Sequence, residues 1–237
     1  MMSTQCSGMR LTFAEPLNRT MIVLMLTLTG VFLLQALVPP FNRFAVAYLA
    51  MNTAAFLGKL YVWQAVTAIF LHGSVQHFVS NMIFLWFFGS ALANAWSRRD
   101  FLTFFFVCGV AGSLCFYIVN VFRAGPEGIT GLGASGAIFG LMIAYAMVFG
   151  ERMILAFFLI PMKAKYFVGI CVAIEILVLY TGAQDGISHI THLGGAVCGA
   201  AYLKIIWRRQ SALAGATEAK AAPGSRIGGL EIMDDEE

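Results

Sequence analysis

Uncharged apolar runs alternate with short charged segments along the chain. The runs cover residues 21–39, 76–96, 101–122, 134–150, 166–184 and 186–203. A helix needs roughly 20 apolar residues to cross a bilayer. The pattern therefore predicts six membrane-spanning helices. The fourth is expected to be short, because closely spaced glycines up to Gly133 favour a loop before it.

The composition supports this prediction and excludes several classes of protein. Of the 237 residues, 59% are apolar and 11% are charged, whereas a soluble domain carries about 25% charged residues. Such a chain cannot cover a soluble domain with polar surface, which argues against a cytosolic enzyme, a nucleic-acid-binding protein or a disordered chain. We expect an all-α membrane protein.

Basic residues set the orientation, because Lys and Arg concentrate on the cytoplasmic side of a membrane. Six spans place both termini on one side. With the termini inside, 12 of the 15 Lys and Arg residues are inside, and only Arg43, Lys59 and Arg123 are outside. We expect a cytoplasmic segment 1–20, a six-helix domain 21–207 and a flexible cytoplasmic tail 208–237.

The membrane and the connecting loops follow from weaker signals. The chain carries no evident added domain, which favours a prokaryotic inner (plasma) membrane, with an organelle membrane as the alternative. The first outer loop, about 40–75, is apolar and aromatic, so we expect it to be membrane-associated and to contain interfacial helices. Residues 153–162 are too short to span, and we expect an interfacial segment there.

Polar residues inside the spans fall in one layer. His77 and Asn81 are four residues apart in the second span, Ser135 opens the fourth, and His192 lies early in the sixth. All three spans run from outside to inside, so their first two turns share the same depth. Polar groups are costly in a bilayer and often mark functional sites. We therefore expect a site just below the outer surface.

Glycine spacing predicts how two of these helices meet. Gly136 and Gly140 are four residues apart in the fourth span, as are Gly195 and Gly199 in the sixth. Small residues at this spacing allow helices to approach closely in a membrane. Such a contact would bring Ser135 toward His192.

A serine hydroxyl becomes a good nucleophile when a base, commonly a neutral imidazole, removes its proton. No Asp or Glu is expected in the polar layer, so the pattern favours a Ser135/His192 dyad over a triad. The side chains of His77 and Asn81 and the backbone N–H of Ser135 are candidate oxyanion donors. Phe139, one turn after Ser135, is placed to pack on the imidazole.

These residues resemble the rhomboid intramembrane serine proteases. The resemblance covers about residues 60–207. Its motifs are Trp63-Gln64, Phe70-Leu71-His72-Gly73, His77-x-x-x-Asn81, Gly133-Ala134-Ser135-Gly136 and His192-x-x-Gly195-x-x-x-Gly199.

The resemblance implies a six-helix rhomboid fold and a Ser135/His192 dyad that cleaves peptide bonds in or beside transmembrane segments. It also implies oxyanion roles for His77 and Asn81 and a close helix contact at Gly195 and Gly199. Phe139 stands where some members carry Tyr.

Other functions fit the sequence less well. A metal transporter would use the four histidines, but no carboxylate or thiol joins them with ligand spacing, so we expect neither a metal nor a cofactor. The expected partners are transmembrane protein substrates and the lipid bilayer, and no nucleic acid. We expect His189 to be a water-accessible rim residue and Glu175 to make a contact between helices below the site.

Overall fold

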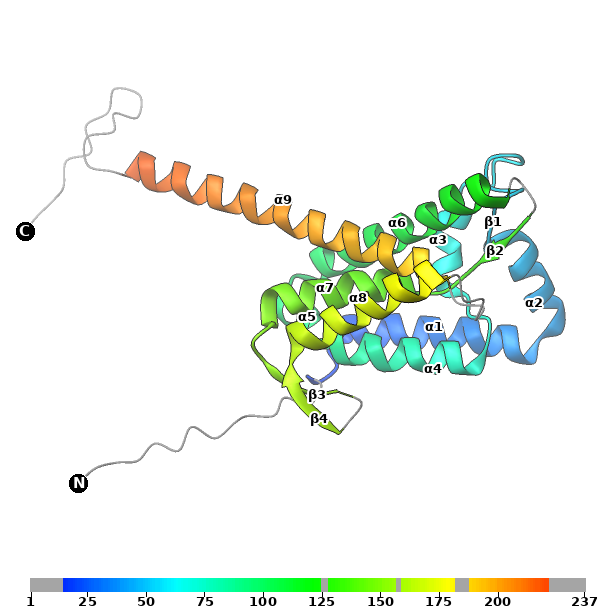
Figure 1. The fold of residues 1–237 in the computed structure, drawn as a ribbon, viewed down its shortest axis with the longest axis horizontal. Helices are drawn as coiled ribbons and strands as arrows, with labels where there is room; N and C mark the ends of the chain where they lie inside the picture. Colours follow the sequence, from blue (N-terminus) through cyan, green and yellow to red (C-terminus); the bar gives the residue numbers. More distant parts are fainter. Residues whose placement is uncertain (1–14, 125–127, 157–158, 182–187, 222–237) are drawn as a thin grey trace, which may run out of the picture. The chain divides into compact units, whose positions relative to one another are not determined.

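The computed structural model describes residues 15–124, 128–156, 159–181 and 188–221, and the chain divides into one unit of residues 1–200 and another of residues 201–237. Helices dominate the described residues, as predicted (Figure 1). The longer helices are α1 (Arg19–Leu37), α4 (Val75–Phe84), α6 (Arg98–Ala124), α7 (Ser135–Phe149), α8 (Ala164–Thr181) and α9 (His189–Ala221).

Shorter elements connect these helices. The short helices are α2 (Pro39–Phe44), α3 (Gln64–Thr67) and α5 (Ser90–Ala95), with π-helical η1 (Ala45–Leu49) and η3 (Leu85–Gly89) and 3₁₀ turn η2 (Ala68–Phe70). The strands are β1 (Met51–Asn52), β2 (Thr130–Gly131), β3 (Met153–Ala156) and β4 (Ile160–Lys163). Because η3 joins α4 directly to α5, these three elements form one continuous apolar segment.

Within the described residues, four helical segments are long and apolar enough to cross a membrane: Arg19–Leu37, Val75–Ala95, Arg98–Arg123 and Ala164–Thr181. They correspond to the first, second, third and fifth predicted spans. α7 is a shorter apolar helix, as its late start predicted, and α9 begins within the predicted sixth span. The total of six spans stays a prediction.

Helix α7 lies at the centre of the first unit. It packs against α4, α5, η3, α6 and α8 (Figure 1). Its side chains are apolar almost all round, and most of its residues are buried, including Leu141, Ala144 and Tyr145. A helix that is hydrophobic on every side needs neighbours on every side. The first residue of this enclosed helix is Ser135, so the fold places that serine inside the unit.

The first outer loop is ordered by short helices, as expected from its apolar sequence. It contains α2, η1, α3 and η2, and Phe56 and Ala65 pack in a buried cluster with Phe116 of α6. Tyr48 and Trp63 keep exposed aromatic surface, and the indole of Trp63 donates to the Tyr48 carbonyl at 2.8 Å. The membrane association of this loop stays a prediction.

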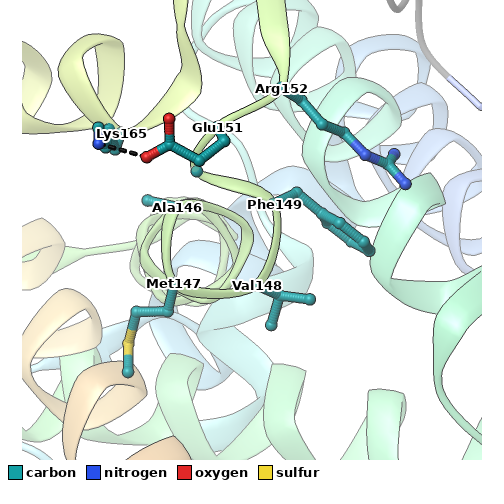
Figure 2. Close-up of a pocket in the computed structure, with 8 residues that line it drawn as sticks. Ala146, Met147, Val148, Phe149, Glu151, Arg152 and Lys165 are labelled. Carbon is teal, nitrogen blue, oxygen red and sulfur yellow. Dashed lines mark hydrogen bonds and ion pairs between the residues drawn. The ribbon is translucent and has the colours of Figure 1, made fainter.

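Where we expected an interfacial segment at 153–162, β3 pairs with β4 in antiparallel register. Lys163 and Lys165 both pair with the carboxylate of Glu151, which precedes β3. An open pocket of about 340 Å³ lies between the last turns of α7 and Lys165. Figure 2 shows the residues that line it. This pocket lies at the opposite end of α7 from Ser135, roughly 20 Å away for a helix of this length.

Helix α9 continues through residues 208–221, the first part of the predicted flexible tail. This part is rich in alanine, which has the highest helix propensity of the amino acids. Residues 222–237 of the predicted tail lie outside the described residues, so their flexibility stays a prediction.

The predicted glycine contact joins α7 to the first turns of α9. A Cβ placed at Gly195 would lie 1.9 Å from the carbonyl oxygen of Gly136, and one at Gly199 would lie 3.0 Å from the Cα of Gly140. The helices therefore touch backbone to backbone, and no side chain larger than hydrogen fits at Gly195. This contact confirms the small-residue spacing read from the sequence.

We predict that Gly195→Ala separates α7 from α9, because the methyl group meets a backbone oxygen that cannot rotate away. The expected cost is about 1–3 kcal/mol of unfolding free energy, as for overpacked cores. Denaturant titration of the purified protein in detergent measures it. Gly169→Ala on α8 is the matched control, because a Cβ there meets nothing within 4 Å. Equal stability of the two variants would contradict the packing argument.

A second prediction concerns pH. Hydrogen bonds from Lys163 and Lys165 lower the pKa of Glu151 from 4.5 to about 2. A carboxylate with a lowered pKa in the folded state contributes stability above its unfolded pKa and loses it as pH falls through the folded pKa. Glu151→Gln should therefore slightly lower the thermal midpoint at neutral pH. The difference from wild type should disappear between about pH 4.5 and 2; a difference that persists at pH 2 would refute this assignment.

Candidate active site

Ser135 is held at the start of α7 by a tight backbone turn. Gly133 has φ +130°, a conformation that favours glycine, and its N–H donates to the Ala68 carbonyl at 2.9 Å. No side chain caps the N-terminus of α7, in contrast to α4, where Ser74 accepts from the His77 N–H. The first N–H groups of a helix have no partner within the helix. The start of α7 thus presents free backbone donors beside Ser135.

The first outer loop fixes the segment that leads to Ser135. β1 pairs with β2 in antiparallel register, Met51 opposite Gly131 and Asn52 opposite Thr130. Next to this pair, the Thr53 N–H donates to the Ile129 carbonyl at 3.0 Å, and the Ile129 N–H donates to Oγ1 of Thr53 at 2.9 Å. The first outer loop, which we expected at the membrane surface, therefore also holds the segment that precedes Ser135.

His192 lies beside the first turn of α7. Its ring stacks on Phe139 with centroids 4.5 Å apart and planes 7° from parallel, which confirms the predicted packing of that ring on the imidazole. Its neighbour Thr191 touches Gly136: a Cβ at Gly136 would lie 3.2 Å from the Thr191 carbonyl oxygen. Ser135 directly precedes Gly136, and His192 directly follows Thr191; both side chains are buried. The structure thus brings the two predicted residues to the same place.

His77 borders the same place from α4. A Cβ at Gly133 would lie 2.8 Å from Nε2 of His77 and 3.7 Å from Oγ of Ser135. Any side chain at position 133 would therefore collide with the imidazole of His77. Glycine is thus required at this position both by the backbone conformation and by this contact. The predicted grouping of His77 with Ser135 agrees with these contacts.

Asn81 lies one turn deeper on α4 and is 5% exposed. Its side-chain nitrogen Nδ2 is buried and has no hydrogen-bond partner among the described residues. Leaving a buried donor unsatisfied costs about 1–3 kcal/mol. A donor held in this state is ready for an acceptor supplied by a ligand.

His72, on the loop before α4, supports His77. Its ring meets the His77 ring edge to face with centroids 5.3 Å apart, and it also packs against Phe32 and Phe78. Burial, with a smaller effect from His77, lowers the pKa of His72 to about 3. His72 is therefore neutral at physiological pH and adds no charge to the site. From the sequence, His72 was expected only as part of the motif Phe70-Leu71-His72-Gly73 and as one of four possible metal ligands.

Glu175 of α8 reaches the site, contrary to our expectation of a layer without carboxylates. Its Oε2 lies 2.6 Å from Nδ1 of His189 and 3.0 Å from Nδ1 of His192. The predicted contact between helices is confirmed, but it is made to the candidate base. His189 is buried against Glu175 and is not the water-accessible rim residue we expected.

Among the residues that the structure describes, one group could hold a metal ion. Single ligand atoms from Glu175, His189 and His192 all lie within 4.8 Å of one another. The expectation that no carboxylate joins the histidines is therefore wrong, because Glu175 of α8 lies beside His189 and His192 of α9. A small cavity of about 10 Å³ between Gly133 and Thr191 has room for about one water molecule.

Comparisons with known proteins give matches to one family. A model of the Rhomboid domain matches residues 59–209. The chain is 32% identical over 202 residues to Presenilin-associated rhomboid-like protein A, mitochondrial, of Danio rerio, which covers 79% of this chain and 50% of that protein. It is 31% identical over 157 residues to RHOMBOID-like protein 12, mitochondrial, of Arabidopsis thaliana, a match that covers 61% of this chain and 45% of that protein. It is 28% identical over 197 residues to Rhomboid protein 1, mitochondrial, of Saccharomyces cerevisiae, a match that covers 70% of this chain and 56% of that protein.

The chain spans about half the length of the curated relatives it matches. Their names place those proteins in mitochondria, and this contradicts our prediction of a prokaryotic inner membrane. That prediction rested on the lack of an evident added domain, a feature that does not distinguish one membrane from another.

Proposed function

Since the chain belongs to the rhomboid family, we propose that it is an intramembrane serine endopeptidase that cleaves peptide bonds in or near transmembrane segments of membrane proteins. The observation that carries the proposal is the placement of His192, stacked on Phe139 beside the helix start that bears Ser135. A buried serine next to a fixed imidazole is the minimum arrangement for nucleophilic acyl transfer.

In this proposal His192 removes the proton from Oγ of Ser135 as the oxygen attacks the scissile carbonyl carbon. The C–N bond of the resulting tetrahedral intermediate breaks, and the protonated His192 returns the proton to the leaving amine. Water then attacks the acyl-enzyme and gives a proton to His192; the ester bond to Oγ breaks, the acid product leaves, and His192 returns the proton to Ser135. The small cavity beside Gly133 and Thr191 is a candidate store for this water.

Three donors support stabilisation of the tetrahedral oxyanion. They are the backbone N–H of Ser135, the amide of Asn81 and the imidazole of His77. The first lies at an uncapped helix N-terminus, where the helix dipole favours negative charge. The second is buried without a partner among the described residues. Preorganised donors in a site shielded from water stabilise developing charge strongly.

The proposed partners are a substrate transmembrane helix and the surrounding lipid. Apolar side chains of α1 and α8 are exposed on the described surface, as expected of helices that face lipid. The mitochondrial names of the relatives favour a mitochondrial membrane for this chain. We infer no requirement for a cofactor or nucleic acid.

Labelling with a fluorescent serine-directed phosphonate tests the nucleophile. Wild-type protein in detergent should label at Ser135, identified by peptide mass spectrometry. Ser135→Ala should abolish labelling, and His192→Ala should reduce it strongly because the hydroxyl then keeps its proton. Cleavage of a model transmembrane substrate should follow the same order.

Ser90→Ala is the matched control, because Ser90 is another buried serine and its hydroxyl donates to the Trp86 carbonyl, away from the small cavity. It should label and cleave as wild type does. If wild type does not label, or if Ser135→Ala and His192→Ala still cleave the substrate, the chain is not a serine protease of this kind.

Asn81→Ala tests the oxyanion donors. One such donor typically contributes about 100- to 1,000-fold to kcat, and because two others remain we expect a loss of about 10- to 1,000-fold with little change in KM. Substrate cleavage in proteoliposomes measures both constants. Ser80→Ala is the control on the same helix, since its hydroxyl bonds back to the His77 carbonyl. A change confined to KM would assign Asn81 to substrate binding instead.

A further inference from the structure

Glu175 is the one charged residue within the six predicted spans. Its side chain is 13% exposed. A carboxylate in this position is costly, and residues of this kind usually face the protein interior and have a partner. Here the partners are two imidazoles of α9, and one of them belongs to the proposed base.

The contact with Glu175 distinguishes the two ring nitrogens of His192. Glu175 approaches Nδ1 at 3.0 Å, so the other ring nitrogen, Nε2, lies on the far side of the imidazole from the carboxylate. A neutral imidazole carries a proton on one nitrogen and a lone pair on the other. A carboxylate at Nδ1 favours the proton there and leaves the lone pair on Nε2, as required of a base.

His189 holds the carboxylate in place. Its Nδ1 lies 2.6 Å from the same oxygen, Oε2, and its ring meets the His192 ring nearly perpendicularly, at 81°. The 3.0 Å contact between Glu175 and His192 is within ion-pair distance but is not aligned as a hydrogen bond. Catalytic hydrogen bonds are often poorly aligned in free enzymes and tighten when substrate binds.

We propose that Glu175 is a positioning residue for His192, so that α8, α9 and α7 together supply a carboxylate, an imidazole and a serine. The inference rests on the proposed function. Glu175 fixes the tautomer and the orientation of the imidazole and stabilises the imidazolium that forms when Ser135 loses its proton. His189 anchors Glu175 through the 2.6 Å contact between its Nδ1 and Oε2.

The distances favour this arrangement over a metal site. Ligands around a tetrahedral zinc ion, each bound at 2.0–2.1 Å, lie about 3.3 Å apart. The Glu175 oxygen is closer than that to both Nδ1 atoms, at 2.6 and 3.0 Å, which are hydrogen-bond lengths. Both nitrogens lie too close to the carboxylate oxygen for the three atoms to be ligands of one tetrahedral zinc ion.

Glu175→Gln in the full chain, reconstituted in proteoliposomes, tests the proposal. The amide keeps the size of the side chain and removes its charge. We expect kcat, and the rate of phosphonate labelling at Ser135, to fall about 10- to 1,000-fold, less than the roughly 10⁴-fold loss when the carboxylate of a serine-protease triad is replaced by an amide. KM and the thermal midpoint should stay near wild type. Ile174→Ala, at a half-exposed neighbour on α8, is the control and should change neither rate.

A double variant separates positioning from mere structural support. If Glu175 acts through His192, adding Glu175→Gln to His192→Ala should cause no further loss, because residues that act as a unit are not additive. Nitrogen-15 NMR of labelled histidine should also show His192 protonated at Nδ1 in wild type and redistributed in Glu175→Leu. Additive losses with an unchanged tautomer would overturn the proposal.

The results separate the positioning role of Glu175 from the protease function. Wild type that labels at Ser135 while Glu175→Gln labels equally fast overturns the positioning role and leaves the protease function intact. Wild type that does not label overturns the protease function itself. One equivalent of tightly bound zinc in wild type, absent from Glu175→Gln, would assign Glu175 as a metal ligand and overturn the positioning role.

Discussion

The contact between α7 and α9 at Gly136 and Gly195 is the constraint on which the site depends. The backbones meet so closely that any Cβ at Gly195 would fall within 1.9 Å of a carbonyl oxygen. In a bilayer, where lipid tails are as apolar as the side chains, such close packing supplies much of the force that associates helices. It also fixes the helix register, because a slip of one residue would move Thr191 off Gly136 and His192 off Phe139. The same packing that stabilises the fold thus aligns the proposed base with the proposed nucleophile.

The remaining parts of the site are held by elements outside this helix pair. The first outer loop binds the segment before Ser135 through the β1–β2 pair and the Thr53–Ile129 bonds. Buried Gln64 ties the same loop together by accepting from the Asn52 N–H at 3.1 Å. These polar contacts satisfy backbone groups that neither lipid nor an apolar core could satisfy. The loop therefore has a positional role that its apolar composition alone does not reveal.

Much of this arrangement could be predicted because it follows from local spacing. The late start of α7 follows from the glycines before it, and the helix contact and the Phe139 stacking follow from residues four apart. The β1–β2 pair and the Glu175 contact could not be predicted in this way. Strands of two residues carry no periodicity, and their pairing joins segments about 80 residues apart. The depth of Glu175 was judged along its own span, but its contacts are to His189 and His192 of α9, and spacing within one helix does not show which side chains of another helix it meets.

The unsatisfied donors of this chain are informative because most other buried polar groups are paired. Ser90 donates to the Trp86 carbonyl at 2.6 Å, and Asn120 donates to the Phe116 carbonyl at 2.8 Å, each within its own helix. Asn81 is equally helical and more buried than Asn120, yet its Nδ2 has no partner in the described part of the chain. An asparagine that only stabilised the helix would make the same backward bond. Its amide is instead left without a partner, at a cost in stability that a ligand oxygen would relieve. This cost supports a site shaped for a charge that exists only during reaction.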